Sequence, residues 1–175
     1  MKPLFLARCA LFCALLCICA WIGIPFGDTV ITLQTFALFL TLGLLGGKAG
    51  FLVCLAYLLL GAAGLPLFSG FRGGLGALLG PTGGYLFGFL SAALIYWLLT
   101  GVLGNRFPSR LFSLCAGLIS CYALGSLWLR WVYFSNALNF WVILLRFVVP
   151  YLIPDGIKLA LAMLLTEKLR PHLRQ

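Results

Sequence analysis

The stretch Tyr85–Leu103, YLFGFLSAALIYWLLTGVL, holds 19 consecutive residues without one charged side chain. The hydrocarbon core of a bilayer is about 30 Å thick, and an α-helix that rises about 1.5 Å per residue crosses it with about 20 apolar residues. In lipid the backbone N–H and C=O groups must be satisfied within the segment itself. The stretch therefore predicts a membrane-spanning α-helix.

Five more apolar runs of comparable character flank this stretch, and Pro25 with Gly27 marks the end of the first. The six predicted spans are Leu4–Ile24, Val30–Gly47, Ala49–Ala63, Tyr85–Leu103, Leu111–Leu129 and Pro150–Lys168. The expected fold is all-α, a polytopic membrane protein of six transmembrane helices forming a single domain over residues 1–175. Between the last two spans, the stretch Arg130–Phe147 indicates a short interfacial helix with aromatic residues at headgroup depth, namely Trp131, Tyr133, Phe134 and Trp141.

The composition excludes a soluble domain, because 63% of the residues are hydrophobic and only 9% are charged. Soluble domains are about 45–50% apolar. The 12 basic residues outnumber the 3 acidic ones, but they lie scattered between apolar runs and form no patch of the kind that binds nucleic acid. We therefore expect lipid, and no nucleic acid, around this chain.

The distribution of the basic residues predicts the orientation, since cytoplasmic loops carry an excess of Lys and Arg. With six spans both termini lie on one side, and that side collects eight of the twelve basic residues: Lys2, Arg8, Lys48, Arg106, Arg110, Lys168, Arg170 and Arg174. We predict a multi-pass protein of the plasma (inner) membrane with both termini in the cytoplasm. Asp28, Arg72 and Arg130 then belong to loops on the outer side.

The segment Gly64–Gly84, between the third and fourth spans, contains eight glycines and two prolines in 21 positions. Such a segment is no ordinary helix, and glycine lets a backbone approach a ligand closely. Non-helical backbone at membrane depth needs protein or a water-filled cavity around it, so we expect this loop to fold back over the bundle. Two simpler interpretations stay open: a flexible apolar connection, and glycines at 83 and 84 that only relieve helix packing.

Asp155 and Lys158 are the most informative polar residues, because a charge inside an apolar span costs about 2.5 kcal/mol or more. A spacing of three places both on one helix face. Pro154 suits the first turn of a helix, where the helix dipole would favour the Asp155 carboxylate. The pair either neutralises itself or forms a ligand site in which the carboxylate accepts N–H groups and the ammonium binds an anion.

Motifs of energy conversion and catalysis are missing from the sequence. Lys48 follows Gly46 and Gly47, but Ala49 stands where a phosphate-binding loop needs Ser or Thr. His172 is the only histidine, and the seven cysteines form no C-x-x-C pair, so we expect no enzyme activity, no metal site and no cofactor. Buried cysteines act as small apolar residues. Ala10 and Ala14 form a small-xxx-small spacing that lets helices approach closely, either within the chain or toward another subunit.

Several of these stretches together resemble the BioY family, the biotin-binding substrate (S) subunits of energy-coupling factor (ECF) transporters. They are Ile31–Phe36, Gly64–Pro66, the string Gly80-Pro81-Thr82-Gly83-Gly84-Tyr85, Tyr122 with Gly125 and Trp128, and Asp155 with Lys158. The resemblance covers nearly the whole chain. It implies capture of biotin at the extracellular side, and partnership with a transmembrane coupling protein and two ATPase subunits that power uptake.

The resemblance also implies roles for individual residues. Asp155 would accept the ureido N–H groups of biotin, and Lys158 would help to hold the polar ligand. A loop with Phe71, Arg72 and Gly73 would close over the site, while Gly83, Gly84 and Tyr85 would begin a helix that lines it. Tyr122 and Trp128 would form aromatic walls, Arg72 or Arg146 would take the carboxylate, and Ala10 and Ala14 would dock the coupling protein. The alternatives are a subunit for another small vitamin and a ligand-free membrane scaffold.

Overall fold

A computed structural model describes residues 3–26, 29–134 and 138–173. Most of the described chain is helical, and one short two-stranded hairpin lies between the first two helices. The elements in chain order are α1 (Pro3–Trp21), β1 (Gly23–Phe26), β2 (Thr29–Thr32), α2 (Gln34–Leu45), α3 (Gly47–Ala62), α4 (Leu75–Leu78), α5 (Gly83–Leu103), α6 (Phe107–Trp128), a π-helical turn η1 (Leu129–Tyr133), α7 (Phe140–Phe147) and α8 (Val149–Leu173).

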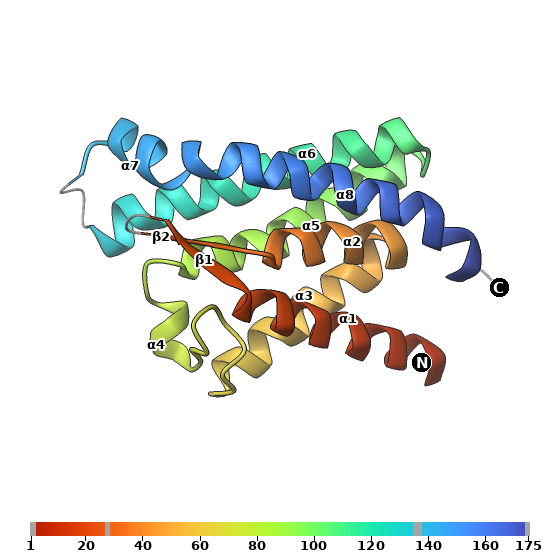
Figure 1. The fold of residues 1–175 in the computed structure, drawn as a ribbon, viewed down its shortest axis with the longest axis horizontal. Coiled ribbons are helices and arrows are strands. Elements are labelled where there is room, and N and C mark those ends of the chain that lie inside the picture. Colours follow the sequence, from red (N-terminus) through yellow and green to blue (C-terminus); the bar gives the residue numbers. More distant parts are fainter. Residues whose placement is uncertain (1–2, 27–28, 135–137, 174–175) are drawn as a thin grey trace.

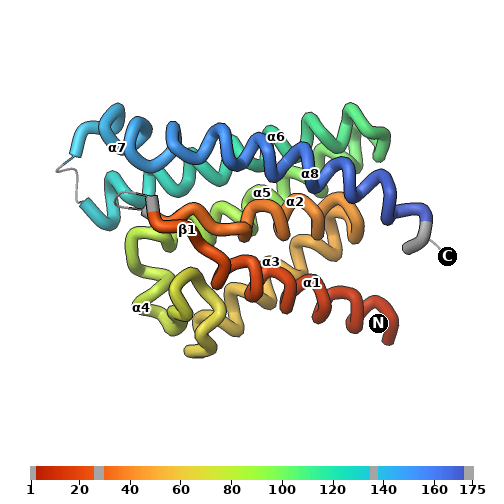
Figure 2. Tube along the Cα trace, viewed as in Figure 1, coloured from red at the N-terminus to blue at the C-terminus, as the bar shows by residue number. Residues whose placement is uncertain are grey.

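The long helices lie side by side, and the start of α1 and the end of α8 are at the same end of the bundle (Figure 1). Helix α2 packs between α1 and α8, and α5 packs along both α3 and α6. The hairpin, α4 and α7 gather at the opposite end, as the tube in Figure 2 shows. The bundle therefore has two distinct ends, one with the chain termini and one with the loops.

Four helices are long and apolar enough to cross a membrane: α1, α5, α6 with its continuation to Tyr133, and α8. The protein thus has the character of a multi-pass membrane protein. Helices α2 and α3 are apolar but have only 12 and 16 residues, or about 18 and 24 Å of helix. The structure therefore gives four spans of full length, and the prediction that these two shorter helices also span stays a prediction.

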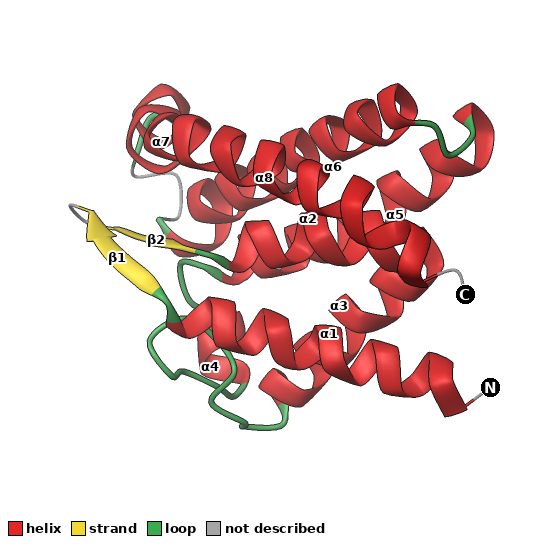
Figure 3. Cartoon of the chain, turned by 45° about the vertical axis from the view of Figure 1, so that its right-hand side comes forward, coloured by secondary structure: helices red, strands yellow, loops and turns green. Residues whose placement is uncertain are grey.

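The first predicted span ended too late and the second began too early, because α1 ends at Trp21 and Ile24 belongs to β1. Residues 29–32 form a strand that pairs antiparallel with residues 23–26, with Ile24 opposite Ile31, and α2 begins only at Gln34. Val30 and Ile31, between two threonines, form a β-branched run that favours a strand. An apolar-run criterion cannot separate such a strand from the start of a helix. The hairpin projects from the bundle beside the α4 end (Figure 3).

Close contact between α5 and α6 depends on glycine. A Cβ atom on Gly84 would lie 2.2 Å from the Cβ of Trp128, and one on Gly88 would lie 2.7 Å from the Sγ of Cys121. Small residues let helix backbones approach in this way, and van der Waals packing is a main source of helix association in lipid. The α5–α6 contact sets the position of Tyr122 and Trp128 relative to the loop end.

Candidate ligand-binding site

Asp155 and Lys158 lie within α8, two turns from its start rather than at it. Helix α8 begins at Val149 and contains Pro154, so the prediction that Pro154 occupies the first turn was wrong. Pro150 holds the second position of the helix and tolerates the loss of an N–H there. Asp155 is therefore beyond the reach of the helix N-terminus, and other side chains must stabilise its carboxylate.

Three side chains from three helices surround that carboxylate. Lys158 Nζ donates to Asp155 Oδ1 at 2.7 Å, and the Thr35 hydroxyl donates to the same oxygen at 2.8 Å. The Tyr122 hydroxyl donates to Oδ2 at 2.7 Å. Lys158 also donates to Thr35 Oγ1 at 3.1 Å. Asp155 is 1% exposed and Lys158 is 7% exposed, so α2, α6 and α8 meet around a buried polar network.

This network forms part of the wall of a cavity of about 230 Å³. The cavity lies toward the loop end, where the hairpin, the 63–82 segment and α7 converge. Its lining combines the polar network with aromatic and aliphatic side chains, the mixture typical of small-molecule sites. The residues that line it are Val30, Thr32, Gln34, Thr35, Phe68, Ser69, Arg72, Pro81, Thr82, Tyr85, Leu86, Phe89, Cys121, Tyr122, Leu129, Phe147, Tyr151, Asp155 and Lys158.

The segment between α3 and α4 contributes Phe68, Ser69 and Arg72 to the cavity. Phe68 is 3% exposed and packs edge-on against Tyr57, with ring centroids 5.4 Å apart. The Tyr57 hydroxyl accepts from Gln34 Nε2 at 2.8 Å and donates to the Leu67 carbonyl at 3.0 Å. A buried chain of hydrogen bonds therefore ties this segment to the start of α2.

Two tyrosines hold the outer rim of the cavity. The Tyr85 hydroxyl donates to the Phe147 carbonyl at 3.1 Å, and the Tyr151 hydroxyl donates to the Val30 carbonyl at 3.2 Å. The first bond joins α5 to the end of α7, and the second joins α8 to the hairpin. Elements that are distant in sequence thus frame one opening.

The structure places five of the predicted site residues on the cavity wall: Asp155, Lys158, Arg72, Tyr85 and Tyr122. Phe71 is instead 63% exposed and stacks on Trp21 with ring centroids 5.0 Å apart. Gly73 packs under the Leu65 carbonyl. Arg146 belongs to α7 and is not among the lining residues.

Gly83, Gly84 and Trp128 form a packing contact beside the cavity. A Cβ on Gly83 would lie 1.8 Å from the Leu78 carbonyl oxygen, and the Gly84 position meets Trp128 as described above. Trp128 Nε1 donates to the Gly80 carbonyl at 3.0 Å. These contacts fit the packing interpretation that the sequence left open, and a part for these three residues in ligand binding stays a prediction.

Thr35, Gln34 and Tyr151 line the cavity but were not predicted as site residues. The signal was present, because Gln34 and Thr35 are adjacent polar residues next to an apolar run, and a buried polar group must find a partner. Gln34 is 7% exposed and its partner is Tyr57.

Ala10 and Ala14, the predicted docking residues, are exposed on α1, and their docking role stays a prediction. Lys2, Asp28 and Arg174 of the orientation argument lie outside the described residues.

A bundle with several membrane-length helices and a ligand-sized cavity around a buried acid and base defines the class: a multi-pass membrane protein with an internal polar site. The model of the BioY family matches residues 2–175. The chain belongs to the BioY family.

Individual relatives agree with this assignment over nearly their full length. The chain is 42% identical to the biotin transporter BioY of Thermotoga maritima, over 94% of this chain and 95% of the relative. It is 38% identical to the probable biotin transporter BioY of Pyrococcus horikoshii, over 97% and 98% of the two chains. A crystal structure of the S-component for biotin from an ECF-type ABC transporter matches with a TM-score of 0.85 and 30% identity, covering 97% of this chain and 92% of that one.

Proposed function

We propose that this chain is a biotin-binding S component of an ECF-type importer and that biotin occupies the cavity around Asp155. The observation that carries the proposal is the buried network of Asp155, Lys158, Thr35 and Tyr122 in the cavity wall. The names of the relatives and the likeness to a biotin S-component support the choice of ligand.

The network suits the ureido ring of biotin, which offers two N–H donors and one carbonyl acceptor. A carboxylate oxygen has two lone pairs, and Asp155 Oδ2 accepts a hydrogen bond from Tyr122. A ureido N–H takes the second position at Oδ2. Lys158 has three N–H donors and uses two of them on Asp155 and Thr35, so one is left for the ureido oxygen. Asp155 and Lys158 also neutralise each other, which keeps both charges tolerable inside the bundle.

Arg72 is the cation that the proposal assigns to the valerate carboxylate. It lines the cavity from the α3–α4 segment, whereas Arg146 does not line it. A guanidinium binds a carboxylate through two parallel hydrogen bonds. Phe68, Tyr85 and Phe89 supply apolar wall for the thioether ring and the aliphatic chain.

The proposal includes six transmembrane helices, with α2 and α3 as the two short ones, and both termini in the cytoplasm. The cavity then faces outward and the basic helix ends face inward, as the excess of Lys and Arg requires. A transmembrane coupling protein would dock on α1 at Ala10 and Ala14, and two ATPase subunits would supply the energy. Exposed small residues on a helix permit such close contact.

Thermal unfolding of the purified protein in detergent tests the ligand. At a thousandfold excess over its dissociation constant, biotin is expected to add about 4 kcal/mol to the free energy of unfolding, while thiamine and riboflavin add nothing. Mass spectrometry of the small molecules released on denaturation identifies a ligand that co-purifies. A thermal shift with another vitamin alone favours a subunit for that vitamin, and no thermal shift with any vitamin favours a ligand-free membrane scaffold.

A further inference from the structure

A second cavity, of about 280 Å³, lies at the end of the bundle opposite the Asp155 network. Helix α2 ends at Leu45 after only 12 residues. Figure 1 shows α8 extending well beyond the turn that joins α2 to α3, with the start of α1 on the other side of this turn. The short helix thus leaves a notch between two longer ones. Its lining residues are Phe5, Arg8, Cys9, Leu44, Leu45, Gly46, Ala49, Asn105 and Arg170.

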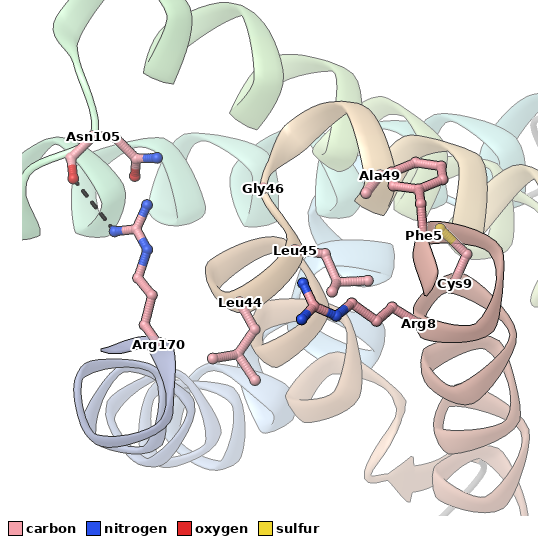
Figure 4. Close-up of a pocket in the computed structure, with 9 residues that line it drawn as sticks. All are labelled: Phe5, Arg8, Cys9, Leu44, Leu45, Gly46, Ala49, Asn105 and Arg170. Carbon is pink, nitrogen blue, oxygen red and sulfur yellow. Dashed lines mark hydrogen bonds between the residues drawn. The ribbon is translucent and has the colours of Figure 1, made fainter. Parts of the chain in front are cut away.

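The notch has two basic walls and an apolar floor. In Figure 4, the Arg8 side chain reaches from α1 toward the α2–α3 turn, Leu44 lies between its guanidinium and Arg170, and Leu45 lies beside the Arg8 side chain. Arg170, on α8, donates to the Asn105 carbonyl at 3.4 Å, and the Asn105 side-chain amide lies beside its guanidinium. None of the nine lining residues, all of which are described, is acidic.

The surroundings of the notch carry a strong excess of positive charge. In the described chain, Arg8, Lys48, Arg106, Arg110, Lys168 and Arg170 all belong to the helix ends and turns at this end. The one carboxylate among them, Glu167, pairs with the 3% exposed Arg110. The field at the notch therefore favours an anion.

We propose that this notch binds the phosphate headgroup of an anionic phospholipid. Guanidinium groups match phosphate oxygens with paired N–H donors, and Arg8 and Arg170 present two such groups from opposite walls. The Asn105 amide adds an N–H donor. Phe5, Leu44 and Leu45 offer apolar surface to the glycerol and the first acyl carbons of a lipid. A soluble anion has no such apolar part. The notch lies at the end of a membrane bundle, where headgroups are always present, and basic pockets between transmembrane helices bind lipid headgroups in this way.

Native mass spectrometry of the protein in detergent tests the proposal with phosphatidylglycerol and phosphatidylcholine as probes. We expect the wild-type protein to retain one phosphatidylglycerol in clear preference to phosphatidylcholine, with retention that falls as the salt concentration rises. The double variant Arg8→Gln, Arg170→Gln is expected to bind phosphatidylglycerol about thirty-fold more weakly, at about five-fold for each basic side chain at a membrane surface. The double variant Arg106→Gln, Lys168→Gln removes the same charge outside the lining, lowers only the surrounding field, and is expected to weaken binding far less than the Arg8, Arg170 variant.

Three results would overturn the proposal: equal retention of the two lipids by the wild-type protein, equal losses in the two double variants, or full displacement of phosphatidylglycerol by millimolar inorganic phosphate. The last result would assign the notch to a soluble anion. Biotin-induced thermal shifts report the fold of each variant without relying on lipid. If the Arg8, Arg170 variant fails to fold, the lipid preference and salt dependence of the wild-type protein decide the matter alone.

Discussion

At the scale of single residues, Asp155 holds the proposed site together. Its two oxygens accept hydrogen bonds from α2, α6 and α8 itself, so one carboxylate joins three helices. Breaking a buried ion pair by removing one partner costs about 3–5 kcal/mol, because the other charge is left uncompensated. The carboxylate oxygens that would bind the ligand therefore also position the helices that surround it.

Replacing Asp155 with Asn tests that carboxylate. The Asn side chain has an NH2 donor in place of one acceptor oxygen of the carboxylate. Lys158, Thr35 and Tyr122 already donate to that carboxylate, so one donor would face another donor. We expect biotin affinity to fall by about 100-fold or more, the equivalent of about 3 kcal/mol for a mispaired buried group, as measured by calorimetric titration in detergent. Glu167→Gln is the matched control, since it removes a carboxylate from the far end of α8, and its affinity should equal the wild-type value. Wild-type affinity in Asp155→Asn would remove Asp155 from the site.

Arg72→Gln tests the assignment of the carboxylate end. Loss of a charge-assisted bond costs about 1.5–3 kcal/mol, so the affinity for biotin should fall by about ten-fold to a hundred-fold. Biotinamide has no carboxylate, and its affinity should be the same in Arg72→Gln and in the wild-type protein. Arg146→Gln is the control on α7 and should bind both ligands normally. A selective loss of biotin in Arg146→Gln instead would move the carboxylate to α7.

At the scale of elements, the α5–α6 contact separates two roles for Gly84. A Cβ at this position would lie 2.2 Å from the Cβ of Trp128, so the packing interpretation predicts that Gly84→Ala forces the helices apart. Overpacking of this kind costs about 1–3 kcal/mol, and we expect a lower midpoint of thermal unfolding. Gly101→Ala, in the same helix with nothing within 4 Å of its Cβ, should leave the midpoint unchanged or raise it. A normal midpoint with reduced biotin affinity in Gly84→Ala would point to the ligand-contact interpretation.

The long apolar helices could be predicted from the sequence, but most hydrogen-bond partners of the buried polar residues could not. Runs such as Tyr85–Leu103 carry their own signal, because every backbone bond of a helix in lipid closes within the run. Asp155 and Lys158 stood out since a charge in an apolar span is expensive. Thr35 comes from a helix 120 residues away from Asp155 in sequence, and no local pattern reports such a contact. The strands at 23–26 and 29–32 were missed because their apolar residues continue the apolar runs of α1 and α2.

At the scale of the whole molecule, the two ends differ in chemistry. One end holds the proposed biotin cavity with the hairpin, α4 and α7, and the other holds the helix termini and most of the basic side chains. Helices α2 and α3 are shorter than the bilayer core is thick. Mismatch of this size is met by local thinning of the bilayer or by polar groups that reach the interface. In the proposed six-helix arrangement, the α2–α3 turn and the notch of Arg8 and Arg170 then lie at headgroup depth.

The orientation of the two ends is testable with an impermeant maleimide on intact cells. In a background with all seven natural cysteines changed to Ala, single cysteines are introduced as Arg106→Cys, Lys168→Cys and Phe71→Cys. The excess of basic residues at the helix termini predicts a cytoplasmic position for the first two, so they should label only after the cells are opened. Phe71 is 63% exposed at the cavity end and should label in intact cells.

Retained biotin binding in each variant shows that the cysteine-free background folds. Labelling of Arg106→Cys from outside would place the α5–α6 turn on the outer face and overturn the six-helix arrangement. Labelling of Lys168→Cys and Arg106→Cys on opposite faces would mean that α6, α7 and α8 do not cross the membrane an even number of times. Only the expected pattern leaves the Asp155 cavity open to the side from which an importer collects its substrate, because the cavity and the basic helix ends lie at opposite ends of one bundle.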